Sequence, residues 1–255
     1  MTEMNMIESL NSALDNMLEV HDNVVIFGED VGYFGGVFRV TDGLQAKHGA
    51  NRVFDAPLAE GGIAAIAFGM GINGLRPVAE IQFADYIFPA YDQIVNEIAK
   101  IRHRSGGEFS TPVTIRTPAG GGIKGGHHHS QSPESQFTHT PGLKVVYCSN
   151  PNNAKGLLTS AIESNDPVIF FEPKRCYRGP FYGDPHNVPT WKGHPKAEVP
   201  EGHYAIPLEE AEVVMEGDAC TVIAWGAMVY VAEQGIIDSG VNAELIDLQT
   251  LLPWD

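Results

Sequence analysis

The sequence has too little positive charge to suggest a nucleic acid or a membrane surface as a partner. Lysine and arginine number 16 against 32 aspartate and glutamate residues, which gives a formal net charge of -16 at pH 7. A phosphate backbone or an anionic lipid surface would repel such a chain. No basic cluster offsets the acidic excess. We therefore expect neither a nucleic acid partner nor a membrane partner.

The sequence also lacks a long apolar run. The nearest candidate, residues 58–75, contains Glu60, Asn73 and five glycines, whereas a membrane-spanning helix needs about 20 mostly apolar residues. We interpret this stretch as a packing helix. Residues 1–5 are polar and lack the basic and apolar parts of a secretory signal. Without a visible targeting segment, we expect a cytoplasmic protein.

Cysteine is scarce and scattered. Cys148, Cys176 and Cys220 are the three cysteines of the chain, and they lie far apart in the sequence. An odd number at this spacing predicts neither a disulfide framework nor a zinc site, and it fits a reducing cytosol. We expect these thiols to lie in or near the core.

The pattern of apolar residues predicts an α/β fold. We expect helices at residues 6–18, 42–47, 63–74, 87–104, 152–164 and 229–237. Short apolar runs at residues 24–27, 52–55, 77–82, 112–116, 144–147, 167–171, 221–225 and 244–248 have the length of strands. Because helices and strands alternate along the chain, we predict a doubly wound, mostly parallel sheet.

The composition divides the chain into three parts. Residues 173–207 contain seven prolines and no helical period, which indicates a linker that crosses the surface. A single strand-helix-strand unit follows, and it is too small for an independent domain. We therefore predict an α/β domain at residues 1–172, a linker at 173–207, and the start of a second α/β domain at 208–255.

One turn places an acid between a strand and a helix. In Asp55-Ala-Pro-Leu-Ala-Glu-Gly-Gly62 the acid is Glu60, and no adjacent residue can pair with it. If the turn is buried, the protonated form of Glu60 is favoured, which suits proton donation near neutral pH. The alternative is a solvated glutamate in the first turn of a helix, stabilised by the helix dipole.

The helix after Glu60 is unusually rich in small residues, among them Gly69, Gly71 and Gly74. Each glycine costs a helix about 1 kcal/mol relative to alanine, and close approach by another backbone is the usual reason to keep it. We expect this helix at the centre of a subunit contact.

Two polar regions follow predicted strands. Gln82 and Tyr86 come at the carboxyl end of a strand, where parallel sheets bind ligands, although both side chains could satisfy only local hydrogen bonds. A glycine-rich loop at residues 120–126 leads to His127, His128 and His129. If that segment is extended, His127 and His129 face the same side. A metal site and surface histidines in a mobile loop are the alternatives.

Several blocks, taken together, resemble the beta subunits of thiamine diphosphate-dependent 2-oxo acid dehydrogenases, and the branched-chain enzymes most of all. The resemblance covers nearly the whole chain. The blocks are Phe27-Gly-Glu-Asp-Val31, Phe34-Gly-Gly-Val-Phe-Arg39, Asp55 to Gly62, Glu80-Ile-Gln-Phe-Ala-Asp-Tyr-Ile-Phe-Pro-Ala90, Asp92-Gln-Ile-Val-Asn-Glu97, His129-Ser-Gln-Ser-Pro-Glu134, Phe170-Phe-Glu-Pro-Lys174 and Ile246 to Asp255. It implies a transketolase pyrimidine-domain fold, followed by an incomplete second domain.

The resemblance implies roles for individual residues. Glu60 matches the family glutamate that hydrogen-bonds the aminopyrimidine of thiamine diphosphate, and Leu58, Gln82 and Tyr86 match residues that line the pyrimidine pocket. His129 matches the histidine that handles protons during acyl transfer. The roles of Glu60 and His129 are therefore expected to be catalytic.

Two weaker assignments concern an acid and a cation. Glu29 resembles part of the acidic chain that links paired active sites in the family. Backbone carbonyls near Val113, Ala161, Ser164 and Asp166 resemble the family's potassium site.

The resemblance also implies partners. The chain has no Gly-Asp-Gly followed by a distant Asn to hold magnesium and diphosphate, so an alpha subunit is expected to supply that half of the cofactor site in an α2β2 heterotetramer. The implied reaction decarboxylates a branched-chain 2-oxo acid and transfers the acyl group to a lipoyl acyltransferase core. A pyruvate or acetoin enzyme is one alternative. A non-catalytic assembly subunit or inactive fragment is another.

Two departures qualify these expectations. The family's single histidine is a triplet here, so the role of His129 depends on the Ser-Gln-Ser-Pro-Glu sequence after it. The family's second domain also continues beyond Pro-Trp-Asp, and its later strands help dimerisation and docking of the acyltransferase core.

Overall fold

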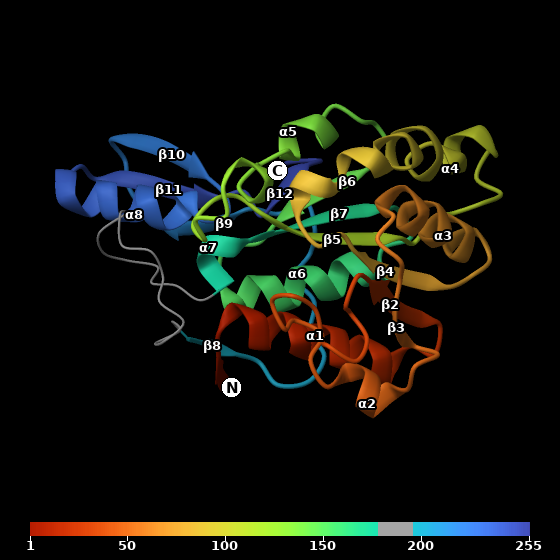
Figure 1. Cartoon of the computed structure of the whole chain (residues 1–255). Coiled ribbons are helices and arrows are strands. Elements are labelled where there is room, and N and C mark those ends of the chain that lie inside the picture. Colours follow the sequence, from red (N-terminus) through yellow and green to blue (C-terminus); the bar gives the residue numbers. More distant parts are fainter. Residues whose placement is uncertain (178–195) are drawn as a thin grey trace.

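The chain is described from a computed structural model that covers residues 1–177 and 196–255 (Figure 1). The expected α/β fold is confirmed by a seven-stranded sheet with the order β12-β6-β7-β5-β4-β2-β3. Neighbouring strands are parallel except for β12, which pairs antiparallel with β6. The strands are β2 (Val24–Gly28), β3 (Val53–Asp55), β4 (Arg76–Glu80), β5 (Thr114–Ala119), β6 (Lys144–Tyr147), β7 (Val168–Pro173) and β12 (Thr250–Leu252).

Helices cover both faces of this sheet (Figure 1). One face carries α1 (Met6–Val20) and α6 (Pro151–Glu163), which lie side by side. The other carries α3 (Glu60–Ile72) and the helical segment that ends with α4 (Ile101–Arg104). Successive strand residues alternate between two cores, so that Ile26 packs with α1 and Phe27 packs with α3. Burial on both faces explains why the strands are continuous apolar runs.

The first helix forms as predicted. The Asn5 side chain caps its N-terminus, and the Glu8 carboxylate accepts from the backbone N–H of Asn5 at 2.9 Å. The apolar residues at helical spacing, from Met6 to Leu18, are buried against α6 and the sheet. The capping box therefore begins the helix where the apolar pattern starts.

The helix predicted at residues 87–104 is present, but it is not one regular α-helix. A 3-10 turn, η2 (Phe88–Ala90), contains Pro89, and a π-helix, η3 (Gln93–Ile98), precedes α4. The Ala99 N–H donates to the carbonyl of Ile94, five residues back, at 2.9 Å. An apolar period cannot reveal the extra residue that a π-helix accommodates.

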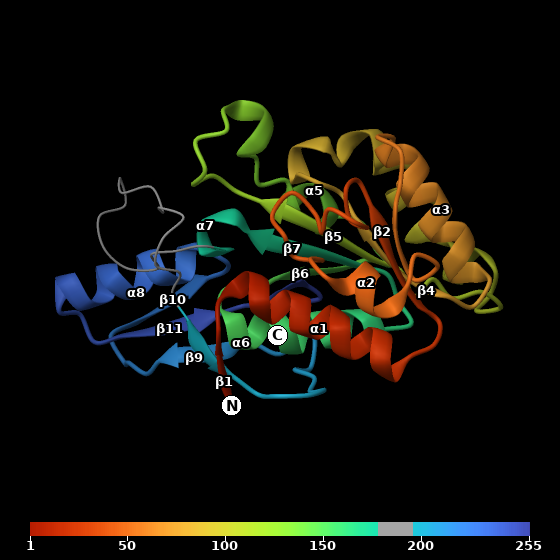
Figure 2. The same cartoon turned by 60° about the horizontal axis from the view of Figure 1, so that its bottom comes forward.

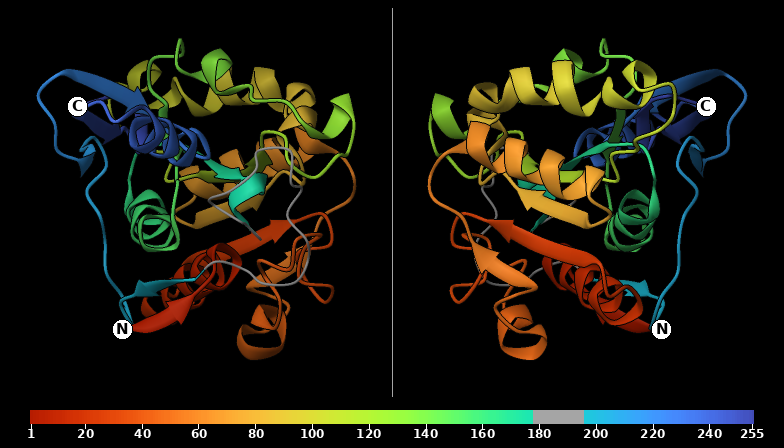
Figure 3. Two further views of the ribbon diagram at one scale, coloured as in Figure 1. Left: turned by 90° about the vertical axis from the view of Figure 1, so that its left-hand side faces the viewer. Right: turned by 90° about the vertical axis from the view of Figure 1, so that its right-hand side faces the viewer.

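A smaller sheet and α8 (Met228–Ser239) gather at one end of the molecule (Figure 2). This sheet has the order β10-β11-β9, from β9 (Glu212–Met215), β10 (Cys220–Ala224) and β11 (Ala243–Asp247). The strands β1 (Thr2–Met4) and β8 (Ala197–Val199) pair near the N-terminus (Figure 3). The sequence did not predict β1, β8, β9 or β12, which contain only three or four residues each.

Short helical turns complete the described chain. They are α2 (Leu44–His48), η1 (Ala84–Tyr86), η4 (His127–His129), α5 (Glu134–Phe137) and α7 (Lys174–Tyr177). Of the linker predicted at 173–207, residues 178–195 lie outside the described residues, whereas α7 and β8 belong to its described flanks.

The three thiols differ in their surroundings. Cys148 and Cys176 are buried as expected, but Cys220 is exposed, so the prediction for Cys220 is wrong. Its side chain lies on β10, an edge strand whose residues are mostly exposed.

None of the helices within residues 1–177 and 196–255 combines the length and the apolar content needed to cross a lipid bilayer.

Candidate functional site

Three buried carboxylates gather where the parallel strands of the large sheet end. Glu29 directly follows β2, Glu80 is the last residue of β4, and Glu172 lies near the end of β7. Because β4 and β7 both pair with β5, Arg116 on β5 lies between Glu80 and Glu172. The carboxyl ends of parallel strands are where open α/β sheets bind ligands. This edge of the sheet is therefore the candidate active site.

Arg116 joins two of these acids in the interior. Its side chain is 1% exposed, and its Nε and one Nη donate to the two oxygens of Glu172 at 2.7 and 2.9 Å. Its other Nη donates to Glu80 at 2.8 Å, and the Tyr177 hydroxyl also donates to Glu172. Burial raises the pKa of the Glu80 carboxyl, and Arg116 opposes that rise. The network holds the floor of the site rigid, since each bond is charge-assisted.

Among the described residues, no cation pairs with Glu29 in this way. Its side chain is 8% exposed, and its Oε1 has no hydrogen-bond partner among the described residues. Burial raises the pKa of the Glu29 carboxyl, and the nearby charges of Glu60, Asp30 and Glu80 raise it further. A buried oxygen without a donor is costly unless a ligand satisfies it. The structure thus places Glu29 and Glu60 within electrostatic reach of each other.

Glu60 begins α3, as the sequence predicted, but its turn is not buried within this chain. Leu58 is 80% exposed, and Pro57 and Ala59 are exposed as well. The Glu60 side chain itself is half-buried. The predicted apolar enclosure of this acid is therefore absent from this chain alone, because the turn projects from the sheet edge.

Tyr86 and His129 meet at the same edge. The Tyr86 hydroxyl lies 3.0 Å from the His129 Nε2, and the His129 Nδ1 lies 3.0 Å from the carbonyl oxygen of Gly125. The His129 ring also packs edge-to-face on Phe83, with ring centres 4.6 Å apart. Gln82 is half-buried nearby on the chain, and its amide reaches Asp30 at 3.4 Å.

The histidine triplet is not extended. Residues His127–His129 form the 3-10 turn η4, so the alternation expected of an extended segment does not apply. The rings of His127 and His128 lie against each other, with centres 3.8 Å apart, whereas the His129 ring meets Phe83 and Tyr86. Within the described residues, no group of three or more histidine, cysteine or acidic side chains could hold a metal ion.

The loop after His129 is held by hydrogen bonds to the Asp85 carboxylate. Asp85 Oδ1 accepts the backbone N–H groups of Ser130 and Gln131, both at 3.1 Å. Sequence reasoning did not single out Asp85, Arg116, Glu172 or Tyr177. A charged residue inside an apolar strand, such as Arg116, was the one signal that could have indicated the buried network.

The residues of the predicted potassium site lie at the other end of the sheet. The Val113 carbonyl accepts from Val168 at 2.9 Å, and the Asp166 carbonyl accepts from the Ser164 hydroxyl at 2.9 Å. The Arg76 guanidinium donates to the carbonyls of residues 162, 163 and 164 at 2.9, 3.0 and 3.0 Å. Ala161 lies in the last turn of α6, directly before these carbonyls. A fixed positive charge therefore already sits at the C-terminus of α6.

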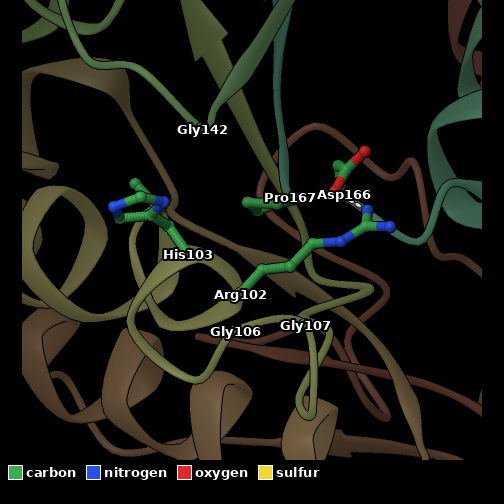
Figure 4. A pocket seen from close by; sticks show the side chains of 8 residues that line it. Arg102, His103, Gly106, Gly107, Gly142, Asp166 and Pro167 are labelled. Carbon is green, nitrogen blue, oxygen red and sulfur yellow. Dashed lines mark hydrogen bonds and ion pairs between the residues drawn. The ribbon is translucent and has the colours of Figure 1, made fainter.

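A pocket of about 420 Å³ lies near this end of the sheet (Figure 4). It is lined by the turn after α4 and by Gly142, Asp166 and Pro167, which precede strands. Arg102 reaches Asp166 across it and forms an ion pair, while His103 lies apart (Figure 4). None of the residues predicted to bind the cofactor lines this pocket.

Comparisons with known proteins bear on the family and the fold. Residues 2–180 match the family described as "Transketolase, pyrimidine binding domain". The chain is 57% identical over 256 residues to the 2-oxoisovalerate dehydrogenase subunit beta of Pseudomonas aeruginosa, covering 100% of this chain and 73% of that protein. It is 52% identical over 258 residues to the mitochondrial 2-oxoisovalerate dehydrogenase subunit beta of Dictyostelium discoideum, covering 99% and 65%.

Two further similarities widen the comparison. The chain is 47% identical over 253 residues to the pyruvate dehydrogenase E1 component subunit beta of Acholeplasma laidlawii, covering 98% of this chain and 73% of that protein. A solved structure described as "Split gene transketolase, inactive beta4 tetramer" superposes with a TM-score of 0.71 at 19% identity, covering 97% and 71%. At that identity, the superposition supports the fold alone.

Proposed function

This chain belongs to the beta subunits of the 2-oxo acid dehydrogenases, a family with a transketolase pyrimidine-binding domain, and on that premise we propose that it works in a branched-chain 2-oxo acid dehydrogenase. In this proposal it binds an alpha subunit in an α2β2 heterotetramer, and the assembled enzyme decarboxylates 2-oxoisovalerate and its homologues. The acyl group then passes to a lipoyl acyltransferase. We place the enzyme in the cytoplasm.

The observation that carries the proposal is the pair of acids Glu29 and Glu60. Glu29 is buried with one oxygen unpaired, and Glu60 and the exposed Leu58 lie at the open side of the same edge. A half-site of this kind fits an aminopyrimidine, which offers nitrogen groups to acids and a flat face to leucine. The partner subunit would cover Leu58 and bury the turn around Glu60. The exposed, small-residue face of α3 is proposed to join the subunit contact.

Thiamine diphosphate, when bound, supplies the carbon nucleophile for decarboxylation. Glu60 would hydrogen-bond the aminopyrimidine, and Leu58, Gln82 and Tyr86 would line its pocket. Glu29 would extend the line of acids from Glu60 toward Glu80 and Arg116 in the interior. Covering the turn at the subunit contact would keep water away from the hydrogen bond between Glu60 and the ring.

His129 is proposed to move protons at this site. Its Nδ1 faces a carbonyl oxygen, so its Nε2 is the nitrogen available for exchange with the Tyr86 hydroxyl or with a substrate. Tyr86 is thus proposed to have two roles, because it lines the pocket and orients His129.

We propose that magnesium and the diphosphate are held by the alpha subunit. For potassium, the carbonyls of Val113, Ser164 and Asp166 already accept hydrogen bonds, and Arg76 brings a positive charge to Ser164. The Ser164 carbonyl bonds the guanidinium, that of Val113 bonds the Val168 N–H, and that of Asp166 bonds the Ser164 hydroxyl. We derive no step through potassium.

The proposal is tested by co-expressing the full chain with its alpha subunit and measuring decarboxylation of several 2-oxo acids. Branched-chain substrates should give the highest kcat/KM, and Glu60→Gln should lower kcat by about 100-fold or more, because general acid-base groups contribute that much. Glu216→Gln, at an exposed position between β9 and β10, is the control. Undiminished activity of Glu60→Gln would rule out the catalytic role.

A pyruvate dehydrogenase is the second candidate, because the chain is also 47% identical to the pyruvate dehydrogenase subunit named above. The same substrate series separates the two candidates. A preference for pyruvate over every branched-chain substrate would favour the second.

A further inference from the structure

Lys174 is a buried cation that the proposed chemistry does not use. It begins α7 directly after β7, and it is 2% exposed. Among the described residues, its Nζ has one hydrogen-bond acceptor, the carbonyl of Pro118, at 3.2 Å. An ammonium carries three donors, and burying it costs several kcal/mol unless opposite charge or a polarisable group compensates. Burial lowers the pKa of the Lys174 ammonium to about 8, and the Asp85 carboxylate opposes that shift.

The aromatic ring of Phe83 connects Lys174 to His129. The Lys174 Nζ lies 5.6 Å from the centre of the Phe83 ring, within the range of a cation–π interaction. The same ring meets His129 edge-to-face, with centres 4.6 Å apart and an interplanar angle of 88°. Phe83 also packs against Tyr86, whose hydroxyl reaches the His129 Nε2. The position of the Phe83 ring therefore affects both members of the tyrosine–histidine pair.

Asp85 provides a second connection, through charge. Its Oδ1 accepts the N–H groups of the two residues that follow His129, whereas its Oδ2 is buried with no hydrogen-bond partner among the described residues. A buried carboxylate oxygen without a donor is stabilised by a nearby positive charge. Lys174 supplies one, since its charge interacts favourably with that of Asp85.

We propose that Lys174 is a positioning residue for His129. Its ammonium holds the Phe83 ring and balances the Asp85 carboxylate, and these two residues hold the His129 ring and the backbone after it. The arrangement keeps Tyr86 and His129 in hydrogen-bonding contact before any ligand binds, which is how preorganised sites work. The inference rests on the function proposed for His129, but the contacts themselves can be tested without activity.

A matched control is present in the same chain. Lys155 on α6 is 0% exposed, donates to the Pro200 carbonyl at 2.8 Å, and lies 5.4 Å from the centre of the Tyr204 ring. It therefore has the same kinds of partner as Lys174. Its two partners, Pro200 and Tyr204, lie outside the His129 loop. A lysine that serves only to fill the core should behave like Lys155.

The experiment compares Lys174→Met, Lys174→Arg and Lys155→Met in the full chain. Amide hydrogen exchange at Ser130 and Gln131 reports on the Asp85 bonds, and nitrogen NMR shifts of the His129 ring report on its bond to Tyr86. Lys174→Met should speed exchange at both amides by about tenfold or more and should move the ring shifts. Lys174→Arg should restore most of both signals, and Lys155→Met should leave both unchanged.

The opposite results would overturn the proposal. These are wild-type exchange and ring shifts in a folded Lys174→Met protein, or equal changes in Lys155→Met. If Lys174→Met does not fold, the Asp85→Asn variant tests the proposal instead. The asparagine side chain keeps an oxygen that can accept the N–H groups of Ser130 and Gln131, but it carries no charge. Its His129 ring shifts should move, and unchanged shifts would refute the link. Activity with the alpha subunit is not among these measurements, so the proposed function can fail independently.

Discussion

The Tyr86 hydroxyl lies 3.0 Å from the Nε2 of His129, while the Nδ1 of that ring lies 3.0 Å from the Gly125 carbonyl oxygen. A carbonyl oxygen can only accept, so Nδ1 carries the hydrogen. In the neutral ring, Nε2 therefore accepts from Tyr86. The contact defines one tautomer and leaves a defined nitrogen for proton exchange.

Tyr86→Phe should lower the kcat of the enzyme assembled with its alpha subunit by about threefold to tenfold, because one hydrogen bond that orients the histidine is lost. Steady-state decarboxylation with acyl transfer measures the effect. Tyr91→Phe is a matched control, since the Tyr91 hydroxyl donates to the Gln136 carbonyl at 3.3 Å. Equal losses in both variants would show that a general packing defect is responsible.

Arg116→Met should destabilise the chain by about 3–5 kcal/mol, because it leaves the buried carboxylates of Glu80 and Glu172 without their counter-charge. Urea unfolding measures the free energy. The exposed pair of Arg104 and Glu97 gives the comparison, and Arg104→Gln should cost less than about 1 kcal/mol. A small effect at Arg116 would contradict the expectation that its charge stabilises the two buried side chains.

Arg76→Ala should lower the free energy of unfolding by about 2–3 kcal/mol, because carbonyl groups at the C-terminus of α6 lose a charged donor.

The wild-type chain should unfold at the same temperature in potassium chloride and in choline chloride of equal ionic strength. A stabilisation of the wild type that only potassium produces would restore the predicted cation site. Arg102→Ala, which removes an exposed ion pair, controls for charge loss at this end.

Asp247 makes stability depend on pH. Burial raises the pKa of its carboxyl to about 6 from the ordinary 3.8, while hydrogen bonds from Ser149, the Gln249 backbone and Asn153 oppose the rise. The folded state thus favours the protonated acid. Its stabilising contribution is complete below the unfolded pKa and is lost as the pH rises through about 6, amounting to about 3 kcal/mol.

Urea unfolding between pH 5 and 7.5 should therefore show a decline in the wild type that Asp247→Asn removes. Asp218→Asn, at an exposed carboxylate that accepts from Asn242, should keep the decline. The same slope in wild type and Asp247→Asn would contradict the expectation.

The large sheet was predictable because each of its inner strands carries apolar residues on both faces. Val24 to Phe27 and Pro167 to Phe171 have no polar residue that could mark a solvent side, which is typical of buried parallel strands. The strands that were missed lie at edges. Thr250–Leu252, for example, is three residues long and pairs with only one neighbour, so periodicity could not identify it.

The candidate site was predictable only in part. The family resemblance indicated Glu60, Tyr86 and His129, and the structure places the last two in contact. The network around Arg116 was missed because it joins residues from three strands, and sequence spacing contains no information on such contacts. The exposure of Leu58 was missed as well, since an apolar residue in a turn was expected to be covered.

The antiparallel strand β12 has a consequence for synthesis on the ribosome. It closes the large sheet beside β6, although about 100 residues of chain separate the two strands. Until residues 250–252 leave the ribosome, the backbone N–H and C=O groups on one side of β6 are unpaired. An unpaired strand edge can form hydrogen bonds with another chain. A nascent chain stalled before this point would therefore be the species most in need of a chaperone.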